Sequence, residues 1–173
     1  MKAVFLDRDG TLIIDADYLS RIEQIQLIPE MLSVCKTLQL AGFKLFIVSN
    51  QSGVARGMFD EATVLAVNAH LLKMLAGQGV VIEKCFYCPH HPSGKNPVYT
   101  KECTCRKPGP GMLLQAAEEF SIDLSQSIMI GDKECDVQAG QAAGCKSFLV
   151  QTIVKDPSKW LKEINGSEVD LKS

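Results

Sequence analysis

The chain has 173 residues, 46% of them hydrophobic, which suffices for one well-formed core and predicts a single domain over residues 1–173. Its formal net charge is −2, from 18 basic and 20 acidic residues. This balance argues against binding to nucleic acid or to an anionic membrane, because both require a basic surface. Aromatic residues make up only 6% of the chain, so single-stranded nucleic acid would find no stacking platform.

The N-terminal ten residues are a short apolar run broken by charges, without the features of a secretory signal. No later segment reaches the roughly 18 apolar residues of a membrane span, so we expect a cytoplasmic protein. Seven cysteines, an odd number, argue against a full disulfide framework there. Four of them are predicted to be core thiols: Cys35, Cys85, Cys135 and Cys145.

Short apolar runs alternate with helical patterns along the chain. The runs, which predict strands buried on both faces, cover residues 3–6, 43–48, 80–86, 127–130 and 146–150. The helical patterns begin at Pro29, after Asp60, near Pro110 and at residue 134, and end near Gly42, Gly77, Phe120 and Gly144. This alternation is typical of an α/β fold, and we expect a three-layer, Rossmann-like parallel sheet. The tail from Gln151 onward predicts no function.

Polar residues follow each of the first four predicted strands. They are DRDGT after the first, SNQSG after the second, a Cys/His segment after the third and GDKECD after the fourth. In parallel α/β sheets, ligands bind beyond the carboxyl ends of the strands. The sequence therefore predicts one site assembled from these four segments.

The acids in these segments predict a metal site. Asp7 and Asp9 stand two residues apart, and Asp132 and Asp136 follow a different strand. Carboxylates this close repel one another and recruit a cation, and oxygen ligands suit Mg²⁺. The alternative is that Asp7 and Asp9 only form a turn, but a turn does not require acids at two separate strand ends.

Two further segments suit phosphate. Ser49 ends the second strand within SNQSG, whose hydroxyl, amides and backbone N–H groups could bind phosphoryl oxygens. Arg106 and Lys107 are a cationic pair ahead of a helix. Taken singly, SNQSG could equally be an ordinary turn, and the cationic pair could be solvated.

Together these four segments resemble the haloacid dehalogenase (HAD) superfamily of phosphotransferases. Asp7-Arg8-Asp9-Gly10-Thr11 matches its D-x-D-x-T signature, and Ser49 and Lys107 match the residues of its second and third motifs. Gly131-Asp132 together with Asp136 matches the acidic fourth motif. All four occur in order, each after the expected strand.

The resemblance implies a two-step phosphoryl transfer. Asp7 would attack phosphorus to form an aspartyl-phosphate, and Asp9 would act first as general acid and then as general base. Mg²⁺ would be held by the Asp7 carboxylate, the backbone carbonyl of Asp9 and Asp132. Ser49 and Lys107 would hold the non-bridging oxygens of the phosphoryl group.

A second metal site is predicted from residue types alone. Cys88 and His90 are followed, after twelve residues, by Cys103 and Cys105, the donors of a closed structural zinc site. The alternative is three unconnected thiols and two loop histidines. Cys85 and His91 neighbour the first pair, but we prefer Cys88 and His90, because Cys85 continues an apolar strand.

This loop resembles one branch of the superfamily, the small phosphatases that act on heptose 1,7-bisphosphate or on histidinol phosphate. Histidinol phosphatases carry a shorter gap between the histidine and the second cysteine pair, so the heptose type is favoured. The resemblance then implies that the sugar and its second phosphate contact Asp15, Tyr18, Ser49, Asn50, Gln51, Ser52, Arg106, Lys107 and Lys133. The pathway implied is the synthesis of nucleotide-activated heptose for lipopolysaccharide.

The segments between the motifs are too short for a cap domain, so we expect an open site in which the zinc loop and nearby turns provide selectivity. A histidinol-phosphate phosphatase remains the nearest alternative function. A zinc-stabilised binding module without activity is an alternative of another class, although every catalytic position carries a competent residue. We expect a monomer.

Overall fold

The computed structural model describes residues 1–155, 160 and 164, and these form one five-stranded sheet. All strand pairs are parallel, and the spatial order is β3-β2-β1-β4-β5. The strands are β1 (Ala3–Leu6), β2 (Lys44–Asn50), β3 (Ile82–Cys88), β4 (Ile128–Gly131) and β5 (Lys146–Leu149). The predicted parallel α/β sheet is confirmed.

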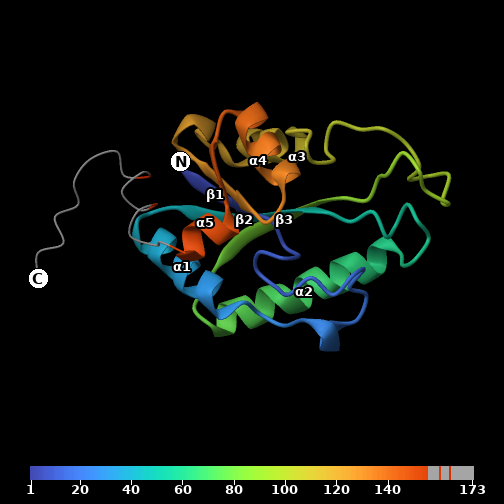
Figure 1. The fold of residues 1–173 in the computed structure, drawn as a ribbon, viewed down its shortest axis with the longest axis horizontal. Coiled ribbons are helices and arrows are strands. Elements are labelled where there is room, and N and C mark those ends of the chain that lie inside the picture. The colour runs from blue at the N-terminus through green and yellow to red at the C-terminus, as the bar shows by residue number, and fades with distance from the viewer. Residues whose placement is uncertain (156–159, 161–163, 165–173) are drawn as a thin grey trace, which may run out of the picture.

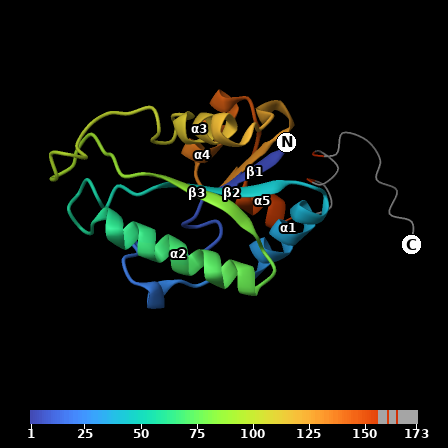
Figure 2. The ribbon, with the colours of Figure 1, turned by 180° about the vertical axis from the view of Figure 1, so that it is seen from behind.

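Helices cover both faces of the sheet, as Figure 1 and the view from behind in Figure 2 show. The first face is covered by α1 (Pro29–Leu40), α2 (Glu61–Gly77) and the short α5 (Val150–Lys155). The second face is covered by α3 (Gly111–Phe120) and α4 (Glu134–Ala143). Single-turn helices lie at Ile22–Gln24 and Leu124–Gln126. The three-layer architecture is therefore present.

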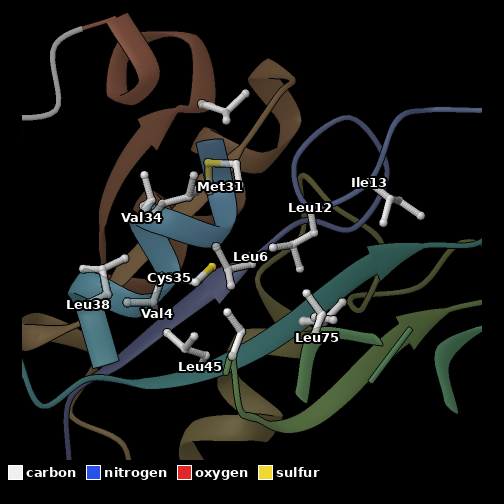
Figure 3. Close-up of a cluster of buried hydrophobic side chains, with 14 of the residues drawn as sticks. Val4, Leu6, Leu12, Ile13, Met31, Val34, Cys35, Leu38, Leu45 and Leu75 are labelled. Carbon is white, nitrogen blue, oxygen red and sulfur yellow. The ribbon is translucent and has the colours of Figure 1, made fainter. Parts of the chain in front are cut away.

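Successive side chains of a strand point to opposite faces of the sheet, and they contribute to two separate cores. In the central strand, Val4 and Leu6 belong to the cluster beneath α1 and α2, whereas Ala3 and Phe5 belong to the cluster beneath α3 and α4. Figure 3 shows Val4 and Leu6 close to Cys35 of α1. A strand buried on both faces needs apolar residues at every position, which explains the continuous apolar run in the sequence.

Helix boundaries follow local chemistry. The Asp60 side chain accepts a hydrogen bond from the Thr63 N–H at 2.8 Å and so caps α2. Gly144 ends α4 with φ +88°, a left-handed conformation that costs glycine little. Both boundaries agree with the prediction, whereas the second and third strands each run two residues beyond the predicted end.

One prediction about a buried residue was wrong. Cys135 is half-buried and lines the hollow beside Asp7 and Lys107, so it is not a core thiol. Trp160, in the tail for which no function was predicted, is 2% exposed and belongs with Ile153 to the core beneath α1. Cys35, Cys85 and Cys145 pack against the two cores as predicted.

None of the described helices is long and apolar enough to cross a membrane.

Candidate active site

The site lies where the chain changes direction across the sheet. From β1 the chain adds β2 and β3 on one side, then crosses over to add β4 on the other. Asp7 follows β1 and Asp132 follows β4, and these strands are paired through Leu6 and Ile130. Such a switch point separates the neighbouring loops and creates a binding crevice in α/β sheets. The sheet thus brings together two acids that are far apart in the sequence.

Gly10 permits this approach. Its φ of +82° is unfavourable for other residues, and a Cβ atom there would overlap the carboxylate of Asp132. The glycine of the DRDG segment therefore lets the loop after β1 close over the acid that follows β4.

Three acids form a cluster. Asp7, Asp132 and Asp136 each bring one carboxylate oxygen to within 4.8 Å of the others. Both oxygens of Asp136 are engaged, one by Lys107 Nζ at 2.6 Å and one by the backbone N–H of Lys133 at 3.0 Å. By contrast, Asp132 Oδ1 is buried and has no partner among the described residues. Asp7 and Asp132 therefore suit a hard cation, and Asp136 holds the lysine.

Lys107 is 3% exposed and lies at the centre of this network. Its Nζ contacts Asp7 Oδ1 at 2.5 Å and donates to the Val48 carbonyl at 2.8 Å, in addition to the Asp136 pair. Burial opposes a charge on Lys107, but the carboxylates of Asp7 and Asp136 outweigh it and raise the lysine pKa. Burial also raises the pKa of Asp7 to about 7, although Lys107 acts in the opposite direction.

The backbone of Lys107 is fixed by Asn50. The Asn50 amide donates to the Lys107 carbonyl at 3.0 Å, and its oxygen accepts from the Lys107 N–H at 3.0 Å. The Asn50 side chain, which was predicted to contact substrate, therefore ties the end of β2 to the segment that carries Lys107.

Gln51 joins Ser49 to Asp9. It is 4% exposed, and its Nε2 donates to Ser49 Oγ at 2.6 Å and to Asp9 Oδ2 at 3.1 Å. Ser49 is 1% exposed and Asp9 is half-buried beside it. The structure thus brings all four predicted catalytic residues to one place.

Two residues of the site were missed by the sequence reasoning. Arg8 is 1% exposed and bonds Asp9, Gln51 and Asn68 of α2. A signal for each was present in the sequence. Asn68 interrupts the apolar face that Val64 begins on α2, and Arg8 is a charge at the end of a fully buried strand. Buried polar groups normally have partners, so these two positions could have been paired.

A cavity of about 200 Å³ adjoins the acid cluster. Its lining combines acids, polar side chains and two aromatic rings, from Arg8, Asp9, Asp15, Asp17, Tyr18, Leu19, Asn50, Gln51, Ser52, Gly53, Phe59 and Lys133. A smaller hollow of about 60 Å³ contains Asp7 and Lys107 and shares Asp9, Asn50 and Lys133 with the cavity. A ligand in the cavity can therefore extend to Asp7.

The predicted substrate contacts divide into two groups. Asp15, Tyr18, Ser52 and Lys133 line the cavity, and Lys133 Nζ lies 3.3 Å from Asp15 Oδ2. Arg106 is not among the lining residues; it donates to the His90 carbonyl at 3.3 Å. No residue of 88–105 is among the lining residues of this cavity, whereas Ser52 and Gly53 of the turn after β2 are. That the zinc loop and nearby turns together provide selectivity stays a prediction.

The four predicted zinc donors converge. Cys88, His90 Nδ1, Cys103 and Cys105 lie within 4.8 Å of one another, with Cys105 Sγ at 3.1 Å from Cys88 Sγ and 3.4 Å from His90 Nδ1. Burial raises the pKa of the Cys88 and Cys105 thiols, so a cation would be needed to favour thiolates. This donor set and spacing fit a tetrahedral zinc ion.

The alternative donors point elsewhere. His91 Nδ1 accepts from the Ser93 N–H at 3.0 Å, and His91 Nε2 contacts Arg56 at 3.1 Å. Cys85 packs against the core beneath α1, where burial raises its pKa to about 12. Neither belongs to the donor cluster, which resolves the ambiguity left by the sequence.

The zinc loop docks on the turn after β2 and on the first residue of α2. Tyr87 and Tyr99 both donate to the Glu61 carboxylate, at 2.9 and 2.6 Å, and the N–H groups of Lys95 and Asn96 donate to the Ala55 carbonyl. In Figure 1 this long loop extends beyond the labelled end of β3. The loop thereby braces the turn after β2 and leads directly into Lys107.

Comparisons with known proteins agree with this geometry. A family model described as HAD-hydrolase-like matches residues 104–169. The D-glycero-β-D-manno-heptose-1,7-bisphosphate 7-phosphatase of Pasteurella multocida is 44% identical, with 98% of this chain and 94% of that protein covered. The chain belongs to the HAD-like phosphatases.

Two more relatives of this HAD-like phosphatase are also named as heptose 1,7-bisphosphate phosphatases. The D-glycero-α-D-manno-heptose-1,7-bisphosphate 7-phosphatase of Photorhabdus laumondii is 39% identical, covering 88% of this chain and 84% of that one. The crystal structure of D,D-heptose 1,7-bisphosphate phosphatase from B. bronchiseptica, complexed with magnesium and phosphate, is 36% identical with a TM-score of 0.75. The structural match spans 86% of this chain and 80% of the B. bronchiseptica chain. The capless HAD-like fold is thus confirmed.

Proposed function

We propose that this HAD-like phosphatase removes the 7-phosphate of D-glycero-D-manno-heptose 1,7-bisphosphate, with preference for the β anomer. The observation that carries the proposal is the junction of the acid cluster with an acid-lined polar cavity. Carboxylates accept hydrogen bonds from sugar hydroxyls, and Tyr18 and Phe59 offer apolar surface to a sugar ring. The relatives named for this substrate support it, and the more similar of the two sequence relatives is named for the β anomer.

Asp7 is the nucleophile in this proposal. Its carboxylate lies at the end of the central strand, and Lys107 Nζ is its direct neighbour at 2.5 Å. Attack on phosphorus forms the aspartyl-phosphate bond and breaks the bond to the leaving oxygen of the sugar. Lys107 and Ser49 stabilise the charge on the non-bridging oxygens of the phosphoryl group.

Asp9 exchanges the proton. It lines both the hollow around Asp7 and the larger cavity, so it can reach an oxygen that joins the two. In the first step Asp9 protonates the leaving oxygen of the sugar, and in the second it takes a proton from the water that hydrolyses the aspartyl-phosphate.

Magnesium would be held by the carboxylates of Asp7 and Asp132 and by the backbone carbonyl of Asp9. The unpartnered, buried Asp132 Oδ1 supports this assignment. When bound, the cation offsets the repulsion between a carboxylate nucleophile and a phosphate dianion. It also favours the ionised form of Asp7, whose pKa burial raises to about 7.

The rest of the substrate occupies the cavity. Asp15 and Tyr18 contact the sugar, together with Ser52 from the turn after β2, and Lys133 pairs with the second phosphate. Arg106 does not line the cavity, and it has two possible roles in this proposal. It binds the second phosphate where that group projects from the cavity, or it holds the zinc loop in place through its hydrogen bond to the His90 carbonyl.

Zinc would be bound by Cys88, His90, Cys103 and Cys105 in a purely structural role. Four protein donors close the coordination sphere and leave no position for a catalytic water. Because Lys107 follows Cys105 by two residues, the ion fixes the start of the segment that carries the catalytic lysine.

The zinc role gives a first prediction. Cys103→Ser should lose zinc and lower the free energy of unfolding by about 3 kcal/mol or more, a fraction of the ~10–16 kcal/mol that zinc supplies in small zinc-dependent folds. Metal analysis of the purified protein and denaturant unfolding measure both quantities. Cys85→Ser is the matched control and should keep its zinc. A stable, active, zinc-free Cys103→Ser variant would refute the assignment.

The proposed substrate also indicates the pathway and the compartment in which the enzyme works. We propose that the enzyme works as a cytoplasmic monomer in the synthesis of nucleotide-activated heptose for lipopolysaccharide. A reducing compartment suits the free thiols of Cys35, Cys85 and Cys145, which lie against the two cores.

The proposed function is tested by phosphate release with Mg²⁺ from the α and β heptose 1,7-bisphosphates and from histidinol phosphate. We expect kcat/KM to be highest for the β anomer and lowest for histidinol phosphate. Phosphorus NMR spectroscopy of the product must show loss of the 7-phosphate and retention of the 1-phosphate. A preference for histidinol phosphate would overturn the substrate and keep the mechanism. Release from none of the three would favour a non-catalytic module.

A further inference from the structure

Arg8 makes an unusually complete set of contacts for a residue between two catalytic acids. Its guanidinium is buried, and its Nε and Nη2 bond Asp9 at 3.0 and 3.3 Å. Nη2 also donates to Gln51 Oε1 at 3.0 Å, and Nη1 donates to Asn68 Oδ1 at 2.9 Å. A buried guanidinium requires such partners, because an unpaired charge in the interior is strongly unfavourable.

These contacts determine which way Gln51 faces. Arg8 can only donate hydrogen bonds, so the Gln51 atom beside it must be the amide oxygen. The amide nitrogen of Gln51 is then directed at Asp9 Oδ2 and Ser49 Oγ. The orientation of Arg8 is thus transmitted to two further side chains of the site.

The two oxygens of Asp9 are not equivalent as a result. Oδ2 accepts from Arg8 Nε and Gln51 Nε2, which uses both of its lone pairs. Oδ1 receives one donor, Arg8 Nη2, among the residues that the structure describes. Oδ1 therefore keeps a lone pair that can carry a proton.

Asn68 anchors this arrangement from outside the catalytic motifs. It lies on α2, is 5% exposed, and interrupts the apolar face formed by Val64, Val67 and Leu71. An apolar side chain at this position would continue that apolar face. It would remove the acceptor that Arg8 Nη1 has among the described residues, and with it the contact that fixes the guanidinium from the side opposite Asp9.

We propose that Asn68 is a positioning residue for proton transfer: through Arg8 and Gln51 it fixes the Asp9 carboxylate with Oδ1 directed at the leaving oxygen. This inference rests on the proposed role of Asp9. A general acid acts only within hydrogen-bond reach of its target, and a small displacement is costly. Asn68 touches neither substrate nor metal in this scheme, so its loss affects the chemical step and not substrate binding.

The test compares two leaving groups in the full-length, metal-loaded protein. The oxygen of a sugar phosphate must be protonated as it leaves, whereas p-nitrophenolate leaves without a proton near neutral pH. For Asn68→Leu, we expect kcat on heptose bisphosphate to fall by roughly 10–100-fold and KM to change by less than about threefold. Single-turnover release of p-nitrophenolate from p-nitrophenyl phosphate, with enzyme in excess, should stay within about threefold of the native rate.

Three variants complete the experiment. Asn68→Asp keeps an acceptor in the same place and should restore kcat to within about fivefold of native. His70→Leu changes a half-buried polar residue on the same helix and should leave both rates unchanged. If Asn68→Leu does not fold, Asn68→Ala removes the acceptor with less added volume and has the same expected results.

Each outcome decides the matter. An unchanged kcat in Asn68→Leu overturns the inference, and equal losses with both leaving groups overturn it in favour of general distortion of the site. Failure of Asn68→Asp to recover kcat would also count against a role as acceptor. If the native protein releases phosphate from neither compound, the proposed function itself fails before the variants are compared.

Discussion

Asp7→Asn is expected to reduce kcat by about 10⁴-fold or more, the scale of losing a catalytic nucleophile. An amide cannot form the aspartyl-phosphate, and it also withdraws a charged ligand from the proposed cation. The fold should persist, because Lys107 keeps its bonds to Asp136 and to the Val48 carbonyl. Phosphate release measures the activity, and denaturant unfolding measures the stability.

The matched control is Asp60→Asn. Asp60 caps α2 away from the acid cluster, and asparagine caps helices about as well as aspartate. This variant should keep native activity. If Asp7→Asn retained activity within about tenfold of the control, Asp7 could not be the nucleophile, because no amide substitutes for it in covalent catalysis.

Asp9→Asn should lower kcat by ~10²–10⁴-fold, the usual contribution of general acid–base catalysis. The amide is nearly the same shape as the carboxylate, so Gln51 and Arg8 remain nearby while proton transfer is lost. Both chemical steps slow, including the attack of water on the aspartyl-phosphate. The covalent phosphoenzyme should therefore accumulate in this variant when p-nitrophenyl phosphate, whose leaving group needs no proton, is the substrate.

Acid quenching followed by intact-protein mass spectrometry detects that species as one added phosphoryl group. Asp17→Asn changes another acid that lines the cavity and should show native turnover of p-nitrophenyl phosphate with no accumulation. A fully active Asp9→Asn variant would assign the proton transfer to another group.

Much of the fold could be predicted because its local signals agree with one another. The five apolar runs became the five strands, and Pro29, Asp60 and Gly144 mark helix boundaries where their chemistry requires. The convergence of Asp7, Asp9, Ser49 and Lys107 could be predicted for the same reason, since polar side chains at the ends of buried strands have few structural roles.

Contacts between distant side chains could not be predicted from local patterns. Asn50 and Gln51 were placed correctly at the site, but their amides are occupied by the Lys107 backbone and by Ser49 and Asp9. Cys135 follows the same logic: its small, apolar context indicates a core, yet α4 turns it toward the catalytic hollow. These properties depend on which elements meet, and sequence spacing alone does not contain that information.

The strand order also constrains how the site can be assembled. β1, β2 and β3 are neighbours both in sequence and in the sheet, so the first half of the chain can build that half of the sheet by pairing consecutive strands. The acid cluster needs Asp132 and Asp136, which arrive only when β4 pairs with the free side of β1. Long-range parallel pairing of this kind is slow to form. No fragment that ends before β4 can hold the cluster, so the candidate site requires the pairing of β4 with β1 and arises late in folding.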